Sequence, residues 1–120
     1  MTTYTALIVD DEPDIRELLE ITLTRMGITT LTAPDLTSAR KLLEQNTTHL
    51  CLTDMNLPDG NGIELVQWIQ KHSPATPVAV ITAYGNMDTA IESLKAGAFD
   101  FVSKPVELPR LRAVSYTHLT

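Results

Sequence analysis

Two alternating hydrophobic patterns run through this chain and constrain its fold more than any other feature. Short apolar runs rich in β-branched residues alternate with longer segments in which apolar residues recur every three or four positions. The strand-like runs cover residues 5–11, 28–33, 49–54, 76–83 and 99–103. The helix-like segments cover residues 14–26, 35–46, 62–72, 86–98 and 106–114. This alternation predicts an α/β domain built on a parallel sheet.

The expected architecture is a doubly wound, five-stranded parallel sheet with helices on both faces, because right-handed crossovers place helices on either side of such a sheet. The 120 residues suffice for one core. The half-polar run 28–33 suits an edge strand. We expect Asp35 or Thr37 to cap the second helix, and Gly27 and Gly97 to end the first and fourth. The apolar helix positions are Ile15, Leu18, Leu19, Leu23, Ala39, Leu42, Leu43, Ile63, Val66, Ile69, Ala90, Ile91 and Leu94.

Charge and composition exclude several classes of function. A formal net charge of −6 argues against a general grip on nucleic acid and suits a protein that binds cations or a basic partner. The single cysteine, Cys51, excludes an internal disulfide and is expected to be buried. The N-terminal residues lack the features of a signal peptide. No apolar run approaches ~18 residues, so we expect no membrane span and a cytoplasmic location.

Polar side chains stand where the predicted strands end. Asp10 and Asp11 end the first strand and Asp54 the third, while Thr82 and Lys104 stand at the ends of the fourth and fifth. Ligands of such sheets bind at the carboxyl ends of the strands. We therefore expect these five side chains to converge on one edge.

The composition of this cluster indicates a cation site that handles phosphoryl groups. Two carboxylates ~4 Å apart repel each other by about 4 kcal/mol at an effective dielectric constant near 20. Stability alone does not favour three of them together. Hard oxygen ligands suit Mg²⁺, and a lysine and a hydroxyl beside that ion can bind phosphoryl oxygens.

Four segments carry a resemblance to a known family. The sequences LIVDDE, LTDMNLPDGNG, VITAYG and DFVSKP resemble, in order and spacing, the signature segments of response-regulator receiver domains from two-component signalling. The resemblance covers about residues 5–114. The segment from Ile81 to Pro105 is most similar to receivers attached to NtrC-group transcription activators. The resemblance implies the strand order 2-1-3-4-5.

The resemblance also implies roles for individual residues. Asp54 would accept a phosphoryl group from the phosphohistidine of a sensor histidine kinase. Asp11, Asp54 and the backbone carbonyl of Asn56 would bind Mg²⁺, and Asp10 would ligate it through water. The phosphoryl oxygens would contact Thr82 and Lys104. The remaining implied roles are a switch formed by Thr82 with Phe101, tuning of the phosphoryl lifetime by Asn56 and Tyr84, and a cis Lys104–Pro105 peptide.

Purely structural roles are an alternative explanation for several of these residues. Asp54 as a helix cap is disfavoured, because the next helix is expected to begin near Gly62. Asp59 in the sequence PDG is interpreted as a turn residue. Phe101 is as readily explained as ordinary core. The histidines match no transition-metal spacing, and Trp68 suits a partly covered surface position.

Three functional classes remain open at this point. The leading one is a phosphoacceptor switch that takes and loses its own phosphoryl group without turning over an external substrate. The second is a Mg²⁺-dependent phosphatase or phosphotransferase with Asp54 as nucleophile. It is disfavoured because Asn56 stands where such enzymes often place a general acid. The third is a degenerate receiver used only for binding.

The C-terminal residues depart from the family pattern. Residues 115–120 carry no acid or strong base, and five of the six are weak helix formers: Ser115, Tyr116, Thr117, His118 and Thr120. We expect them to be frayed and foreign to the native domain. The resemblance implies that phosphorylation reshapes the face formed by the fourth helix, the fifth strand and the fifth helix, and that this face often dimerises. Because the end of the fifth helix departs from the family pattern, we expect normal phosphorylation but poor dimerisation. The output domain that the family implies is absent from these residues, and any DNA binding or ATPase activity would belong to it.

Overall fold

The computed structural model describes residues 4–83 and 85–119, of which residues 117–119 are described by their backbone. Its main feature is a 5-stranded sheet in the order β2-β1-β3-β6-β7, with every pairing parallel. Counted along the chain, this is the expected order 2-1-3-4-5. The strands are β1 (Thr5–Val9), β2 (Thr29–Ala33), β3 (Leu50–Asp54), β6 (Val78–Thr82) and β7 (Asp100–Ser103). The half-polar β2 lies at an edge, which confirms that prediction.

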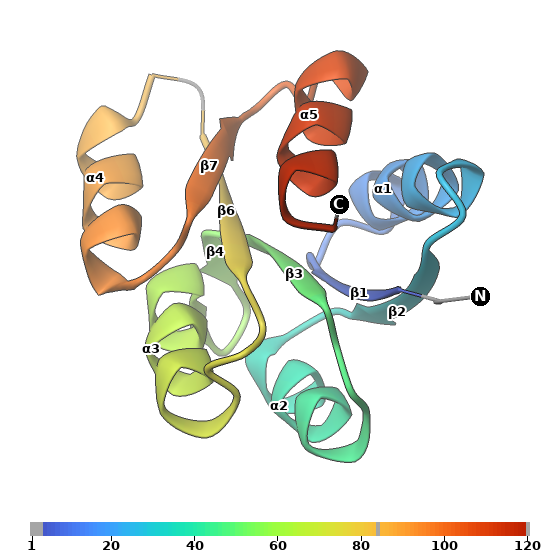
Figure 1. The fold of residues 1–120 in the computed structure, drawn as a ribbon. Helices are drawn as coiled ribbons and strands as arrows, with labels where there is room; N and C mark the ends of the chain where they lie inside the picture. Colours follow the sequence, from blue (N-terminus) through green and yellow to red (C-terminus); the bar gives the residue numbers. More distant parts are fainter. Residues whose placement is uncertain (1–3, 84, 120) are drawn as a thin grey trace.

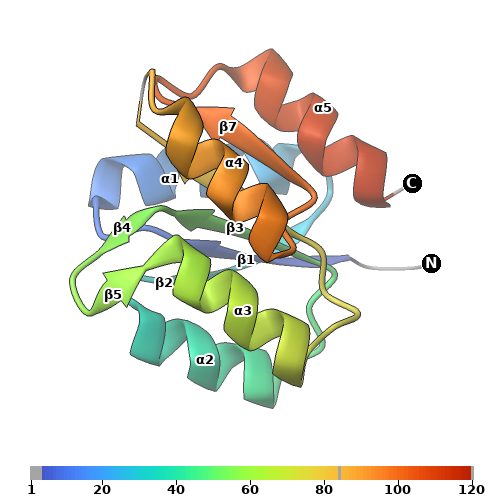
Figure 2. The same cartoon turned by 90° about the vertical axis from the view of Figure 1, so that its left-hand side faces the viewer.

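Helices cover both faces of the sheet (Figures 1 and 2). The helices α1 (Pro13–Arg25) and α5 (Leu108–Leu119) lie on one face, and α2 (Leu36–Gln45), α3 (Gly62–His72) and α4 (Met87–Ala96) lie on the other. Alternate residues of the central strands point to opposite faces. Ala6 and Ile8 of β1 therefore pack with α1 and α5, while Leu7 and Val9 pack with α2 and α3. The doubly wound fold is confirmed.

Local signals in the sequence fix several element boundaries. The Asp35 carboxylate accepts a hydrogen bond from the Ser38 N–H at 2.8 Å, so Asp35 is the cap of α2. Gly97 ends α4 with a φ of 126°, a conformation that favours glycine.

Two further predictions are confirmed. Cys51 is fully buried, as expected. The Lys104–Pro105 peptide is cis, which confirms the sequence-based expectation.

Three of the predicted apolar helix positions are exposed rather than buried. Leu18 of α1 is 37% exposed, and Ile91 and Leu94 of α4 are 45% and 39% exposed. The fourth helix buries its small residues instead, because Ala90 and Ser93 are fully buried. The Ser93 hydroxyl donates to the Ala90 carbonyl at 2.7 Å, which allows a polar side chain to pack there.

The prediction of a frayed C-terminus is wrong. The last helix continues to Leu119, and Leu111, Val114 and Ser115 are buried. The Ser115 hydroxyl donates to the Leu111 carbonyl at 2.8 Å, so a weak helix former is accommodated inside the helix. Burial against α1 and the sheet outweighs the low helix propensity of this segment. The foreign origin of residues 115–120 stays a prediction.

A small antiparallel ribbon, which the periodicity did not indicate, follows β3. It pairs β4 (Asn56–Leu57) with β5 (Gly60–Asn61) directly after Asp54. Within the part of the chain that the structure describes, no helix is both long and apolar enough to cross a membrane.

Candidate functional site

The strand ends bring the predicted polar residues to one edge of the sheet. Asp54 and Thr82 are the last residues of β3 and β6, whereas Asp10 and Lys104 follow β1 and β7. Pairing continues beyond the strands, because the Lys104 N–H donates to the Thr82 carbonyl at 2.8 Å. Similarly, the Asp10 N–H donates to the Ala33 carbonyl at 3.1 Å. The backbone therefore holds these residues in register.

Four carboxylates form the acidic part of the site. Asp10, Asp11, Glu12 and Asp54 each offer an oxygen within 4.8 Å of the others. Asp10 and Asp54 are buried, while Asp11 and Glu12 are exposed. One Asp10 oxygen, Oδ1, accepts the Glu12 N–H at 2.8 Å. The other, Oδ2, is buried without a hydrogen-bond partner among the described residues.

Burial dominates the electrostatics of the two inner carboxylates. It raises the pKa of Asp10 from its ordinary 3.8 to about 6, and the nearby charge of Asp54 adds to the rise. Burial also raises the pKa of Asp54, although the Lys104 ammonium opposes this change. The folded domain therefore keeps two poorly solvated acids side by side, at a cost in stability when they ionise.

Lys104 is the cation that faces these acids. Its Nζ lies 3.3 Å from Oδ2 of Asp54 and 3.2 Å from Oε1 of Glu12. Burial lowers the pKa of Lys104, but the charges of Asp54 and Asp10 and the two hydrogen bonds outweigh burial, so the net change is upward. The lysine is therefore a fixed positive charge beside Asp54.

The hydroxyl of Thr82 completes the edge. Thr82 is buried, and its Oγ1 has no hydrogen-bond partner in residues 4–83 or 85–119. Buried polar atoms are almost always paired in folded proteins. An unpaired hydroxyl and an unpaired carboxylate oxygen at one edge indicate groups that bind a ligand. The donor set, mainly carboxylate oxygens, fits a hard divalent cation such as Mg²⁺.

The loop after Asp54 is fixed at several points. The Gly62 N–H donates to the Met55 carbonyl at 2.7 Å. A Cβ at Gly62 would lie 2.7 Å from the Asp54 carbonyl oxygen, so only glycine fits this close approach. Asn56 is exposed in β4, two residues beyond Asp54. The backbone of Asn56 makes a hydrogen bond to the Asp54 carboxylate, so this loop begins beside the acidic cluster.

Asp59 occupies the predicted turn but also has a function that the sequence did not indicate. Its carboxylate accepts hydrogen bonds from the N–H groups of Leu36 and Thr37, at 2.8 and 3.1 Å, and from the Thr37 hydroxyl at 2.9 Å. These bonds, led by that from Leu36, lower the pKa of Asp59. Asp59 therefore ties the loop after Asp54 to the start of α2.

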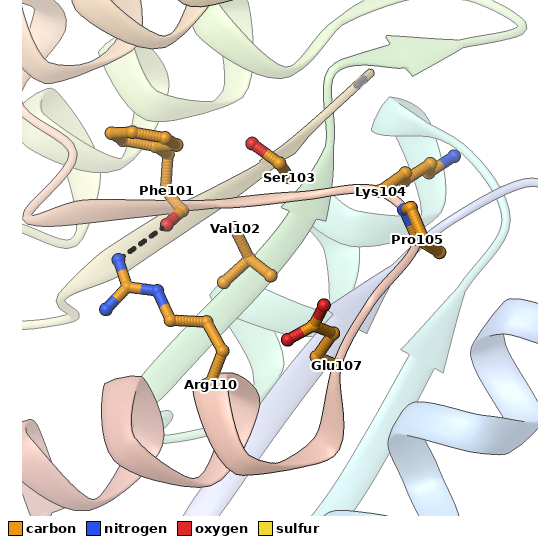
Figure 3. Close-up of a pocket in the computed structure, with 7 residues that line it drawn as sticks. All are labelled: Phe101, Val102, Ser103, Lys104, Pro105, Glu107 and Arg110. Carbon is orange, nitrogen blue, oxygen red and sulfur yellow. Dashed lines mark hydrogen bonds between the residues drawn. The ribbon is translucent and has the colours of Figure 1, made fainter. Parts of the chain in front are cut away.

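Phe101 lies in β7, three residues before Lys104. It is half-buried and lines a cavity of about 380 Å³ together with Glu107 and Arg110 (Figure 3). Arg110 donates to the Phe101 carbonyl at 3.0 Å and pairs with Asp100 at 2.8 Å. Phe101 belongs to neither of the buried hydrophobic clusters that the described residues form. The interpretation of Phe101 as an ordinary core residue is therefore wrong. Tyr84 lies outside the described residues.

The sequence analysis missed the part played by Glu12. Asp10, Asp11, Asp54 and Lys104 are brought together as the strand ends required. Glu12 joins them as a second partner of Lys104. The signal available in the sequence was its position directly after the two aspartates, but nothing there showed the direction of its side chain.

Comparisons with known proteins agree with this geometry. Residues 6–115 match the family described as the response regulator receiver domain. The chain is 62% identical over 119 residues to the response regulator protein PilR of Pseudomonas aeruginosa, covering 99% of this chain and 27% of PilR. It is 35% identical over 108 residues to the regulatory protein AtoC of Escherichia coli, covering 90% of this chain and 23% of AtoC. It therefore spans about a quarter of the length of these relatives.

Solved structures show the same fold. The receiver domain of NtrX from Brucella abortus superimposes with a TM-score of 0.90 at 36% identity, covering 95% of this chain and 97% of that one. The beryllofluoride-activated NtrC4 receiver domain dimer gives a TM-score of 0.89 at 32% identity, covering 95% of this chain and 94% of that one.

Proposed function

Because the chain belongs to the response regulator receiver domain family of two-component signalling, we propose that Asp54 is its phosphoacceptor. The observation that carries this proposal is the pairing of a buried Asp54 carboxylate with Lys104 at 3.3 Å, at the carboxyl edge of the sheet. The Thr82 hydroxyl, buried and unpaired in the described part of the chain, stands on the neighbouring strand. This arrangement provides a nucleophile, a fixed cation and a free hydrogen-bond donor.

The proposed reaction is phosphoryl transfer from a phosphohistidine of a sensor histidine kinase. An Asp54 carboxylate oxygen attacks phosphorus, an O–P bond forms, and the N–P bond breaks as the imidazole leaves with its electron pair. Lys104 and Thr82 would contact the oxygens of the transferred group. The phosphoryl group is later lost by hydrolysis, in which a water oxygen attacks phosphorus, the O–P bond to Asp54 breaks, and inorganic phosphate and the Asp54 carboxylate are formed. Asn56 and Tyr84 are the residues proposed to tune its lifetime.

The residues present fit a Mg²⁺ ion. Asp11, Asp54 and the backbone carbonyl of Asn56 would hold it, and Asp10 would bind it through water, as the family resemblance implies. The unpaired Oδ2 of Asp10 supports this assignment. When bound, the ion would offset the negative charge of the acidic cluster and of the phosphoryl group.

We further propose that phosphorylation is communicated to an attached output domain with a transcriptional function. The chain covers 27% of PilR, which leaves most of such a regulator outside these residues. Thr82 and Phe101 are the proposed switch residues, and light scattering before and after phosphorylation tests for a homodimer. No direct contact with nucleic acid or membrane is proposed for this domain, and a cytoplasmic location follows from the proposed partnership with the kinase.

A single experiment separates the candidate functions. The protein is incubated with acetyl phosphate and Mg²⁺, and the modified peptide is identified by mass spectrometry, with Asp54→Asn as the matched control. A mass gain on Asp54 that persists for minutes supports the switch, which turns over no external substrate. Rapid release of phosphate over many turnovers would instead favour a phosphatase, and absence of modification would favour a degenerate receiver.

A further inference from the structure

Glu12 occupies a position at which helices ordinarily carry a capping residue. It is the N-cap residue of α1, yet its side chain makes no cap hydrogen bond to that helix. Short side chains such as Ser, Thr, Asp and Asn are preferred there because they reach the N–H groups of the first turn. The Glu12 carboxylate instead lies 3.2 Å from Nζ of Lys104, 92 positions further along the chain. This side chain therefore serves another element.

The backbone of Glu12 gives that contact a fixed base. Its N–H donates to Oδ1 of Asp10 at 2.8 Å, and its carbonyl accepts from the Arg16 N–H at 3.1 Å. The Arg16 guanidinium in turn donates to the Asp10 carbonyl at 2.8 Å. Because these bonds fix where the side chain begins, its reach toward Lys104 is defined.

The Lys104 ammonium is shared between two carboxylates. Glu12 and Asp54 accept from it at 3.2 and 3.3 Å. An ammonium has three N–H donors, so one remains for a phosphoryl oxygen. The Lys104 side chain is 25% exposed, and a lysine with a flexible four-carbon stem can turn to water when nothing holds it. Glu12 provides a second anchor that does not depend on Asp54.

We propose that Glu12 is a positioning residue, which holds the Lys104 ammonium at the site while the Asp54 carboxylate reacts. The inference rests on the proposed function of Asp54 as phosphoacceptor. An aspartate at position 12 would be one methylene shorter, so the length of glutamate suits the reach across from α1 to the residue after β7. Glu12 touches neither Asp54 nor the transferred group in this proposal and acts through Lys104.

Two variants separate the tether from the charge. Glu12→Gln removes the charge but keeps an oxygen that can accept from Lys104, whereas Glu12→Ala removes both. Any loss of repulsion toward an anionic donor is common to both variants. We therefore expect acetyl phosphate and Mg²⁺ to phosphorylate Glu12→Gln about threefold faster than Glu12→Ala, the scale of one weak hydrogen bond. The exposed Glu17 of α1 provides the control, because Glu17→Gln and Glu17→Ala should react at equal rates.

A second measurement reports on Lys104 without phosphorylation. Reductive methylation with formaldehyde, quantified by mass spectrometry of the peptide, should modify Lys104 about threefold faster in Glu12→Ala than in the original chain. The exposed Lys71 serves as the internal reference. Equal phosphorylation of the two Glu12 variants, or equal methylation of Lys104 with and without Glu12, would overturn the proposal. If Asp54 accepts no phosphoryl group at all, the proposed function fails and the methylation rates alone decide on the tether.

Discussion

Replacing Asp10 by asparagine should stabilise the domain at neutral pH when Mg²⁺ is absent. Burial raises the pKa of Asp10 from 3.8 to about 6. Between these two values the folded state binds more protons than the unfolded state, so stability falls as the pH rises through this window. Below pH 3.8 the acid is protonated in both states and the cost vanishes. Asparagine carries no charge at any pH and keeps the Oδ1 that accepts the Glu12 N–H.

The size of the effect follows from the same pKa values. A change from 3.8 to about 6 corresponds to about 3 kcal/mol at 1.36 kcal/mol per pKa unit. Relaxation of the surrounding groups offsets part of the cost of burying the charge, so we expect roughly half of this, ~1.5 kcal/mol at pH 7. For a chain of this length such a gain raises the melting temperature by about 5 °C.

The assay is urea unfolding followed by circular dichroism, in EDTA, at several values between pH 4 and pH 7. The gain in free energy of unfolding for Asp10→Asn should be near zero at pH 4 and grow to its full value above pH 6. The exposed Glu17→Gln should show no such profile. A variant that is less stable than the original chain at pH 7, or a gain that is independent of pH, would refute the reasoning.

Three further predictions concern the same edge of the sheet. Mg²⁺ at ten times its dissociation constant should raise the free energy of unfolding by about 1.4 kcal/mol, measured by calorimetry. Asp11→Asn should abolish this rise. Equal rises in both proteins would contradict the assignment of Asp11 as a Mg²⁺ ligand. Gly62→Ala should lower the free energy of unfolding by roughly 2 kcal/mol, because its Cβ would meet the Asp54 carbonyl at 2.7 Å. A Cβ at Gly27 would meet no atom within 4 Å, and only the φ of +83° disfavours alanine there. Gly27→Ala should therefore lower the free energy of unfolding in urea by about 1 kcal/mol, and a loss equal to or larger than that of Gly62→Ala would contradict the argument. Because hydrogen bonds lower the pKa of Asp59, its stabilising effect should be present above pH 3.8 and be lost as the pH falls below that value. Asp59→Asn should therefore be less stable than the original chain at pH 7 and approach it near pH 3, and a constant difference would exclude this explanation.

The sheet could be predicted from the sequence because its strands are buried on both faces. Runs such as Leu50–Asp54 and Val78–Thr82 are buried throughout, and alternation with helical segments identifies them as strands of a parallel sheet covered by helices on both faces. The β4–β5 ribbon escaped prediction because strands of 2 residues carry no period. The exposure of Ile91 and Leu94 could not be foreseen either, since periodicity gives the spacing of a helix face without showing which face packs.

The site was predictable where the backbone alone determines position. Parallel strands end at one edge, so Asp10, Asp54 and Lys104 had to meet there whatever their side chains do. The contacts of Glu12 with Lys104 and of Asp59 with Thr37 span 92 and 22 positions. They depend on side-chain direction and loop placement, which local pattern does not specify. Prediction therefore failed for the side chains that hold the reactive residues in place.

The electrostatics of this edge suggest how binding there can influence the rest of the domain. Four carboxylates lie together at this edge, two of them (Glu12 and Asp54) pair with the Lys104 ammonium, and burial opposes the ionisation of Asp10 and Asp54. A ligand that relieves this repulsion stabilises whichever arrangement of the edge binds it best. The same backbone that places Thr82 also joins it to Lys104 and hence to β7. The carbonyl of Phe101 in β7 in turn accepts a hydrogen bond from Arg110 of α5. A continuous series of backbone pairings and hydrogen bonds therefore connects the carboxyl edge of the sheet with α5.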